Sequence, residues 1–323
     1  MILAGSDESI TQGDRMKQAA MLVIMLSLAT FLYAQQQTPA TQNQPAGKPG
    51  STSQGAQPAT PAQGAAAQPA QPQGKRPPQA KTQPEFDAYK AATANTSDPA
   101  ALEKAADDFA AKFPDSELRP ILYRTAMHSY QAANNADKML EMGRKVLKFD
   151  PDDPEALVGA AQVLAERTRD TDLDKDQRLD EATKLAQHSL ETVDTDIAIP
   201  AGTPQDKVDA YKAFLRSSAY AIIGTIQFNR EKYADAEASL RKSIDADPQN
   251  PDPVAIFRLA VALDKQDKVP EALKYAEQAV SLTKEGTAVG TAARNERDRL
   301  VQLNRGAAPG AKPPASAQNP TPH

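Results

Sequence analysis

The sequence predicts an all-α fold in which short helices follow one another in pairs between flanks that do not fold. Residues 220–250 have the pattern of two amphipathic helices whose large and small side chains alternate in a fixed order, and similar pairs recur before and after them. In contrast, residues 35–83 contain 13 Gln, 9 Pro and 10 Ala, with no acidic and no large apolar side chain. Such a segment cannot bury enough surface to offset the entropy lost on ordering, so we expect it to be disordered.

The window at 220–250 resembles a tetratricopeptide repeat. The matching positions, in order, are Tyr220, Ile223 and Gly224 in the first helix and Tyr233, Ala236, Leu240 and Pro248 in the second. Small residues let the two backbones approach while the large ones interdigitate around them. Because one repeat cannot bury its own apolar face, the resemblance implies a right-handed superhelical solenoid of stacked repeats.

Two helix pairs are predicted before this window up to residue 151. The first opens near Gln83 and is marked by Phe86, Tyr89, Leu102, Ala106 and Phe113. The second is marked by Tyr123, Ala126, Tyr130 and Leu147. In this pair Met139 stands where the family usually has a small residue.

The third and fourth pairs carry extra residues. Leu157, Ala160, Ala161 and Leu164 predict one helix of the third pair, and Leu179, Ala182, Ala186 and Leu190 predict the other, with an acidic insert between them. Before the 220–250 window, an apolar stripe runs on from Val208 through Tyr211 and Leu215, which predicts one helix of about 25 residues, against a mean nearer 11 or 12. Thr203 is its predicted cap, with Pro204 at the first helical position and Asp206 completing the start.

A fifth pair and a terminal helix complete the predicted domain, which spans residues 84–304. The pair is marked by Ile256, Leu259, Ala260, Leu263, Ala272, Ala276 and Ala279, and ends at Gly286. Residues 288–304 combine many charged side chains with Val289, Ala293, Leu300 and Leu303, as expected of the solvating end cap that a solenoid needs. Residues 305–323 have the composition of a disordered tail.

The N-terminal residues 1–34 predict a secretory signal. Lys17 precedes the apolar run at 19–34, which is followed at once by a polar stretch; this order is typical of signal peptides. Cleavage is expected after Ala34, with Ala29 as the alternative, and Met16 is a possible true start because the residues before it fit no signal. The chain has no cysteine, so a lipid-anchored lipoprotein is excluded. An uncleaved 19–34 segment acting as a membrane anchor is the second interpretation, although the run is shorter than the roughly 20 residues of a spanning helix. We therefore expect an exported bacterial protein, periplasmic or associated with the envelope.

The charge balance argues against a nucleic-acid partner. The chain has a formal net charge of −5, and its flanks carry more basic than acidic residues, so the repeat region is the acidic part. Nucleic-acid binding proteins present a basic face instead. The acidity is typical of a solvated outer surface.

The acidic insert at 170–181 has some features of a metal site. Asp170, Asp172, Asp174 and Glu181 have the spacing of a calcium-binding loop between two helices, but Lys175 stands where that loop requires glycine for its sharp turn. The sequence therefore favours a hydrated turn, and a calcium-regulated module or an enzyme accessory centred on this insert is the alternative hypothesis. No acid, base and nucleophile constellation is found, so we expect neither catalysis nor a cofactor.

The resemblance implies that the first helices of successive repeats line a groove that binds another protein or peptide. Carried over to this chain, the groove residues are Arg124, His128, Gln131, Gln162, Thr225, Phe228, Asn229, Phe257 and Val261. One familiar subclass grips a peptide's C-terminal carboxylate with Lys, Asn and Arg, but the corresponding positions hold Glu155, Gly159, Ala221 and Ile222. We therefore expect a mixed polar and apolar ligand around Phe228 and Phe257, and an interaction scaffold that takes part in envelope assembly.

Overall fold

The computed structural model describes residues 74–94, 98–200 and 202–306, and in these ranges the helices form five consecutive pairs followed by a terminal helix. The pairs are α2 (Gln83–Thr93) with α3 (Pro99–Lys112), α4 (Arg119–Ala132) with α5 (Ala136–Phe149), α6 (Pro154–Arg167) with α7 (Lys175–Thr192), α8 (Gln205–Asn229) with α9 (Tyr233–Ala246), and α10 (Pro253–Asp264) with α11 (Val269–Leu282). The terminal helix is α12 (Ala288–Gly306). The predicted all-α arrangement of five pairs and a terminal helix is confirmed. The predicted signal at 1–34 lies outside the described residues.

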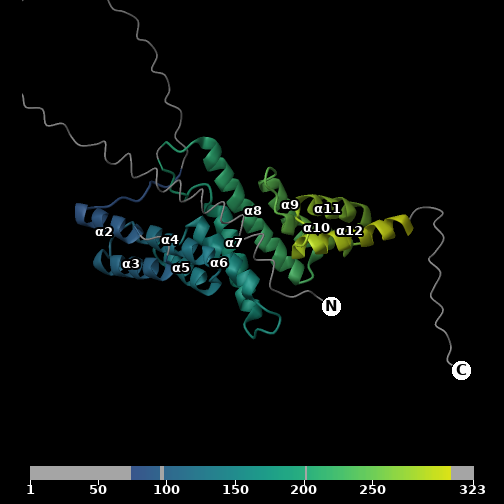
Figure 1. Ribbon diagram of the computed structural model, residues 1–323, viewed down its shortest axis with the longest axis horizontal. Coiled ribbons are helices and arrows are strands. Elements are labelled where there is room, and N and C mark those ends of the chain that lie inside the picture. The colour runs from purple at the N-terminus through teal and green to yellow at the C-terminus, as the bar shows by residue number, and fades with distance from the viewer. Residues whose placement is uncertain (1–73, 95–97, 201, 307–323) are drawn as a thin grey trace, which may run out of the picture.

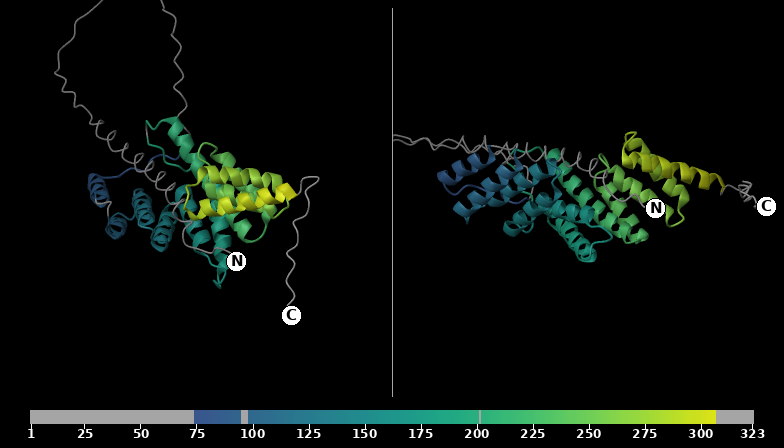
Figure 2. Two further views of the ribbon diagram at one scale, coloured as in Figure 1. Left: turned by 45° about the vertical axis from the view of Figure 1, so that its right-hand side comes forward. Right: turned by 60° about the horizontal axis from the view of Figure 1, so that its bottom comes forward.

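The helices are stacked in chain order along the long axis of the molecule, from α2 at one end to α12 at the other (Figures 1 and 2). Each helix from α2 to α12 contacts the next one in sequence. Among the first helices, α2 contacts α4, α6 contacts α8 and α8 contacts α10. Contacts between sequence neighbours in this regular order are the mark of a solenoid.

Three of the pairs share one turn geometry. The turns after α4, α8 and α10 each contain one non-glycine residue with positive φ, namely Asn134 (55°), Glu231 (58°) and Asp267 (59°). The amide of the residue after it donates to a carbonyl five residues back, as Lys232 N does to Gln227 O at 2.9 Å. This is the Schellman arrangement that satisfies the last carbonyls of a helix. The same closing bonds occur at Asn135 and Lys268, so the turns of these three pairs share one backbone geometry.

Close approach of the two helices in the fourth pair depends on Gly224. A Cβ atom at Gly224 would lie 2.7 Å from Cγ of Leu240 and 3.2 Å from its backbone N, so only glycine fits unless Leu240 moves. In the second pair, the unexpected Met139 is accommodated by a glycine of the following pair. A Cβ atom at Gly159 would lie 3.2 Å from the Met139 Cε. The large side chain of Met139 is thus matched by a small residue in the next pair and not in its own.

The helix α8 has the predicted length of 25 residues, but its start differs from the prediction. Pro204 is its N-cap and no side chain caps the helix, while the Thr203 hydroxyl donates to the carbonyl of Pro200 at 2.8 Å. The preceding chain turns back at Pro200, which draws the Thr203 hydroxyl away from the helix. The extra turns of α8 bury Val208, Tyr211 and Leu215, and the last two pack in the core with residues of α6 and α7.

The last residues of the segment expected to be disordered, 74–82, instead lie against the repeats. Lys75 forms an isolated parallel bridge with Ala198, in the connection between α7 and α8. Figure 1 shows this segment running from the start of α2 to that connection. Its charged side chains find partners on three loops, which composition alone does not reveal. Residues 35–73 lie outside the described part of the chain.

The terminal helix α12 covers the end of the core. Ala293 and Leu300 are fully buried, the first beside Ile256 and Ala279 and the second in the cluster of α8 to α11. The exposed side of α12 is largely polar, which agrees with the end cap expected from the sequence. Residues 307–323 of the predicted tail lie outside the described range.

Candidate partner-binding face

The nine predicted groove residues all lie on first helices: three on α4, one on α6, three on α8 and two on α10. We call the side formed by α4, α6, α8 and α10 the first-helix face. In this face α6 contacts α8 and α8 contacts α10, and side chains of α4 reach the start of α6. The environments of the nine residues fall into two groups, one on α4 and α6 and the other on α8 and α10.

On α4, the side chains of Arg124 and His128 point to the next pair and are bound there. The Arg124 guanidinium donates to Asp153 Oδ2 at 2.6 Å, and its Nε lies 3.8 Å from Glu155 Oε2. His128 Nε2 bonds to the other oxygen of Glu155. Tyr211 of α8 also hydrogen-bonds to Glu155. Together Arg124, His128, Asp153, Glu155 and Tyr211 form what we call the inter-repeat charge cluster.

Charges in this cluster are largely withdrawn from water and balance one another. The side chain of Asp153 is 3% exposed and that of Glu155 is 14% exposed. Burial by itself raises the pKa of Glu155, but the neighbouring His128 and Arg124 and the Tyr211 hydrogen bond lower it to about 2. Burial raises the pKa of Asp153, and Arg124 opposes this effect. Removing one partner from such a group leaves an uncompensated buried charge, so the cluster has a structural role between repeats.

The sequence pattern missed Glu155 and Asp153 as partners of Arg124 and His128. Asp153 is the N-cap of α6, where its Oδ1 accepts from Ala156 N at 2.9 Å while Oδ2 accepts from Arg124. The sequence does contain a signal for this pairing. Arg124 and His128 are one turn apart on a predicted helix, and the two acidic residues Asp153 and Glu155 stand at the start of the next first helix. Pairing them required knowing that α4 and α6 lie close together.

The other two predicted groove residues on α4 and α6, Gln131 and Gln162, offer little to a partner. Gln162 is 7% exposed and its amide donates to Glu166 on the same helix at 2.7 Å. Gln131, near the end of α4, is half-buried. This part of the predicted groove is therefore mostly committed to internal contacts.

The residues on α8 and α10 are more open. Phe228 is half-buried with its ring 5.6 Å from that of Tyr233, while Asn229 is exposed. Thr225, Phe257 and Val261 are also half-buried. The helices α8 and α10 contact each other, and we call the five predicted side chains that they carry the α8–α10 strip. The structure thus brings these five predicted residues onto one pair of neighbouring helices and keeps them apart from the charge cluster.

The four acidic residues considered as candidate calcium ligands do not form a metal site in the described part of the chain. Asp170 binds Lys175 Nζ at 2.7 Å, and Glu181 accepts from Arg144 of α5 at 2.9 Å. Asp172 accepts from the backbone N of Arg169. The loop projects beyond its neighbours at the lower edge of Figure 1. Within the described ranges, no group of three or more His, Cys, Asp or Glu residues is placed to hold a metal ion.

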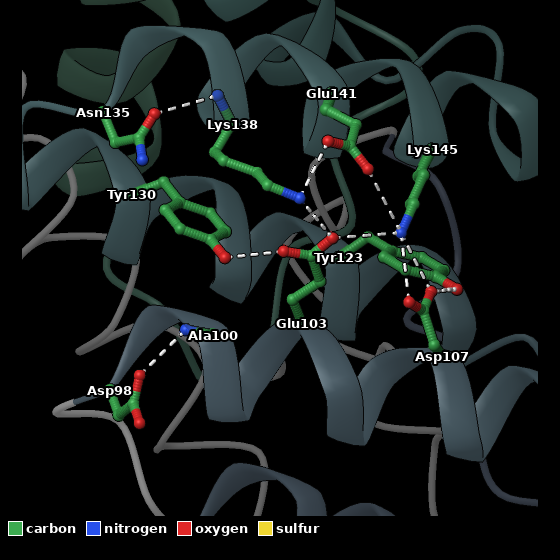
Figure 3. Close-up of polar contacts among 10 residues, drawn as sticks. All are labelled: Asp98, Ala100, Glu103, Asp107, Tyr123, Tyr130, Asn135, Lys138, Glu141 and Lys145. Carbon is green, nitrogen blue, oxygen red and sulfur yellow. Dashed lines mark hydrogen bonds and ion pairs between the residues drawn. The ribbon is translucent and has the colours of Figure 1, made fainter.

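A second polar network joins the second helices of the first two pairs (Figure 3). Glu103 of α3 accepts from Tyr130 at 2.6 Å and from Lys138 of α5 at 3.0 Å, and Asp107 accepts from Tyr123 at 2.7 Å and from Lys145 at 3.0 Å. Burial raises the pKa of Tyr130 to about 12, with the Glu103 hydrogen bond acting in the same direction. Both phenols are thus held protonated as donors, and the network ties one repeat to the next.

No helix in the described part of the chain has both the length and the apolar character needed to span a membrane. The segment at 19–34, which the sequence offers as an alternative anchor, lies outside that part.

Comparison with known proteins assigns the fourth pair to a family. A family model described as "Tetratricopeptide repeat" matches residues 217–250, which comprise the second half of α8 and all of α9. No curated protein matches the chain. Among solved structures, "Assembly Chaperone of RpL4 (Acl4) (Residues 1-338)" is similar with a TM-score of 0.31 and 14% identity, covering 65% of this chain and 99% of that one. The fourth pair therefore matches a tetratricopeptide repeat, and its turn geometry recurs after α4 and α10.

Proposed function

We propose that the protein is an exported, non-enzymatic scaffold that binds a partner protein or peptide on its first-helix face. The observation that carries this proposal is the half-buried strip of Thr225, Phe228, Phe257 and Val261, with exposed Asn229 beside it, on two adjoining first helices. Aromatic and aliphatic anchors surrounded by polar groups contribute most of the binding energy at protein interfaces. A helix or an extended segment of the partner would lie along this strip.

The proposed contact region is smaller than the groove expected from the sequence. Arg124 and His128 bind Asp153 and Glu155 inside the molecule, so substituting them tests folding as well as binding. In contrast, Asn229 is exposed and Val261 is half-buried, so substituting either one changes a side chain that a partner can reach. These two positions are therefore the ones to probe.

Site-specific photo-crosslinking tests the proposal directly. A benzophenone amino acid placed at Asn229 or Val261 should form adducts with a partner in envelope preparations, because both lie on the proposed strip. The matched control is the same probe at Lys104, an exposed residue of α3 whose ion pair with Asp108 is local. Equal adducts from all three positions, or adducts from Lys104 alone, would contradict the proposed face.

Export and an envelope role rest on the sequence. The apolar run at 19–34 and the long Gln, Pro and Ala segment after it are arranged as a signal followed by a tether. The mature N-terminus, determined by mass spectrometry together with the cell fraction that holds the protein, tests this part. A start at residue 35 or 30 in the periplasmic fraction would support export and cleavage. An intact N-terminus in the cytosol would refute both.

A further inference from the structure

Three loops line up along one edge of the solenoid. Residues 113–118, 150–153 and 193–204 each connect the second helix of one pair to the first helix of the next. Residues 74–82, which we call the strap, contact all three of these loops. The strap thus reaches from the α7–α8 connection back to the start of the first repeat (Figure 1).

Two adjacent basic residues anchor the strap on acidic side chains. Lys75 Nζ lies 2.5 Å from Asp150 Oδ1 and 3.9 Å from Asp196 Oδ1. One guanidinium nitrogen of Arg76 is 2.8 Å from both oxygens of Glu117. The hydrogen bond from Arg76 holds the pKa of Glu117 below its usual value. Acidic residues from three separate loops therefore recognise one Lys-Arg dipeptide.

Backbone contacts accompany these ion pairs. Lys75 bridges to Ala198, and a Cβ atom on Gly74 would lie 2.8 Å from the carbonyl oxygen of Ile197, so the two chains run very close together. Further along, Lys81 Nζ donates to the carbonyl of Asp115 at 2.7 Å. Main-chain pairing that gives affinity, combined with side-chain contacts that give selectivity, is a general mode of recognising extended peptides.

The strap is suited to this mode because Pro77 and Pro78 follow the basic pair. Proline fixes φ and favours an extended conformation, so little entropy is lost when the segment is held straight. The same features would serve any segment of this composition, including one from another protein.

The strap is held by contacts that can open. None of residues 74–82 is buried; Arg76 is 61% and Lys75 36% exposed at the side chain. Exposed ion pairs contribute little to stability, because water and salt screen them. A competing segment must overcome the local concentration of the tethered strap, which is on the order of millimolar for short flexible connections.

We propose that the loop edge is a binding site for an extended peptide with two adjacent basic residues followed by proline. Residues 74–82 occupy it in the free protein, and a partner segment of the same chemistry replaces them. The site lies on the loops, and its existence does not depend on binding at the first-helix face.

A labelled peptide tests this proposal on the full-length chain. The probe is a fluorescent peptide with the sequence of residues 74–82, GKRPPQAKT. The double variant Lys75→Glu/Arg76→Glu places acids against Asp150, Asp196 and Glu117, which should release the strap. By fluorescence anisotropy, this variant should bind the peptide at least tenfold more tightly than wild type does. Raising salt from 50 mM to 500 mM should weaken binding, because the contacts are exposed ion pairs.

Two matched controls make the test specific. Adding Glu117→Arg to the double variant should lower peptide affinity at least tenfold, and a peptide carrying Glu in place of both basic residues should not bind. Circular dichroism confirms that each variant is folded, and hydrogen exchange at residues 197–199 should quicken in the double variant because the bridge is lost. The proposal is wrong if those amides stay protected, if the double variant binds no better than wild type, or if the acidic peptide binds equally well.

Discussion

At the scale of single residues, the closest helix contact in the fourth repeat depends on the missing side chain of Gly224. We predict that Gly224→Ala lowers the free energy of unfolding by about 2 kcal/mol, because inserting a methyl group into a packed interface typically costs 1–3 kcal/mol. The added Cβ would meet both the side chain and the backbone of Leu240. Urea unfolding followed by circular dichroism measures the change.

Gly143 of α5 is the matched control for that substitution. A Cβ atom there would meet its nearest neighbour, Met127 Sδ, at 3.4 Å, an ordinary contact distance. Gly143→Ala should therefore be neutral or stabilising by up to about 1 kcal/mol, since alanine is the better helix former. Equal losses in both variants would show that helix packing at Gly224 is not the cause.

The inter-repeat charge cluster gives a second prediction at this scale. Arg124→Met should destabilise the protein by about 3 kcal/mol, because removing one partner of a buried ion pair leaves the other charge unpaired. Replacing the acids as well, with Asp153→Asn and Glu155→Gln, should recover part of that loss. If the triple variant is less stable than Arg124→Met alone, the hydrogen bonds of the acids matter more than their charge.

The lowered pKa of Glu155 gives a third prediction, on pH. A glutamate with a pKa of about 2 in the folded state and about 4.3 when unfolded stabilises the protein above pH 4.3. That contribution is lost as the pH falls through 2. The stability difference between wild type and Glu155→Gln should therefore be largest above pH 5 and shrink towards pH 2. A stability difference that stays constant between pH 6 and pH 2 would contradict this prediction.

At the scale of elements, the starts of α8 and α10 differ in whether a side chain caps the helix. Asp252 caps α10 by accepting from Val254 N at 3.0 Å, whereas Thr203 bonds away from α8. Asp252→Ala should cost about 1 kcal/mol, the usual value for loss of an N-cap. Thr203→Ala should change stability by less than about 0.5 kcal/mol, as surface substitutions do. A larger effect at Thr203 in thermal unfolding would mean that the turn at Pro200 is needed to start α8.

Helix positions could be predicted from the sequence because apolar periodicity is a local property. Five pairs and the 25-residue α8 follow from it. Contacts between distant residues could not be predicted in this way. Met139 looked wrong for its own repeat because its partner Gly159 belongs to the next one. Likewise, Arg124 and His128 looked like free groove residues because Asp153 and Glu155 come from another helix pair.

The order of the strap could not be predicted from its composition. Its residues belong by composition to a segment without large apolar side chains, and such segments do not form a core of their own. They are ordered by a surface that the repeats create, through charges on three loops. Composition predicts whether a segment can fold alone, and it cannot say whether another part of the chain will hold it.

At the scale of the whole molecule, the stability of a solenoid is close to a sum of repeat and interface contributions, because each repeat contacts only its neighbours. Among the described residues, polar links between second helices join adjacent repeats: α3 with α5 through Glu103 and Lys138, α5 with α7 through Arg144 and Glu181, and α9 with α11 through Arg241 and Glu271. Damage at one end should therefore stay local rather than unfold the entire chain.

Leu300 of α12 provides a test of that locality. It is fully buried against α8 to α11, so Leu300→Ala removes apolar contacts and leaves a cavity, at a cost of about 2–5 kcal/mol. Hydrogen exchange should quicken in α10, α11 and α12 and remain unchanged in α3 to α5. Leu303, on the same helix and 45% exposed, is the matched control, and Leu303→Ala should alter neither region. Faster exchange along the whole chain in Leu300→Ala would mean instead that the repeats unfold as one cooperative unit, with the first-helix face, the loop edge and the end cap coupled to one another.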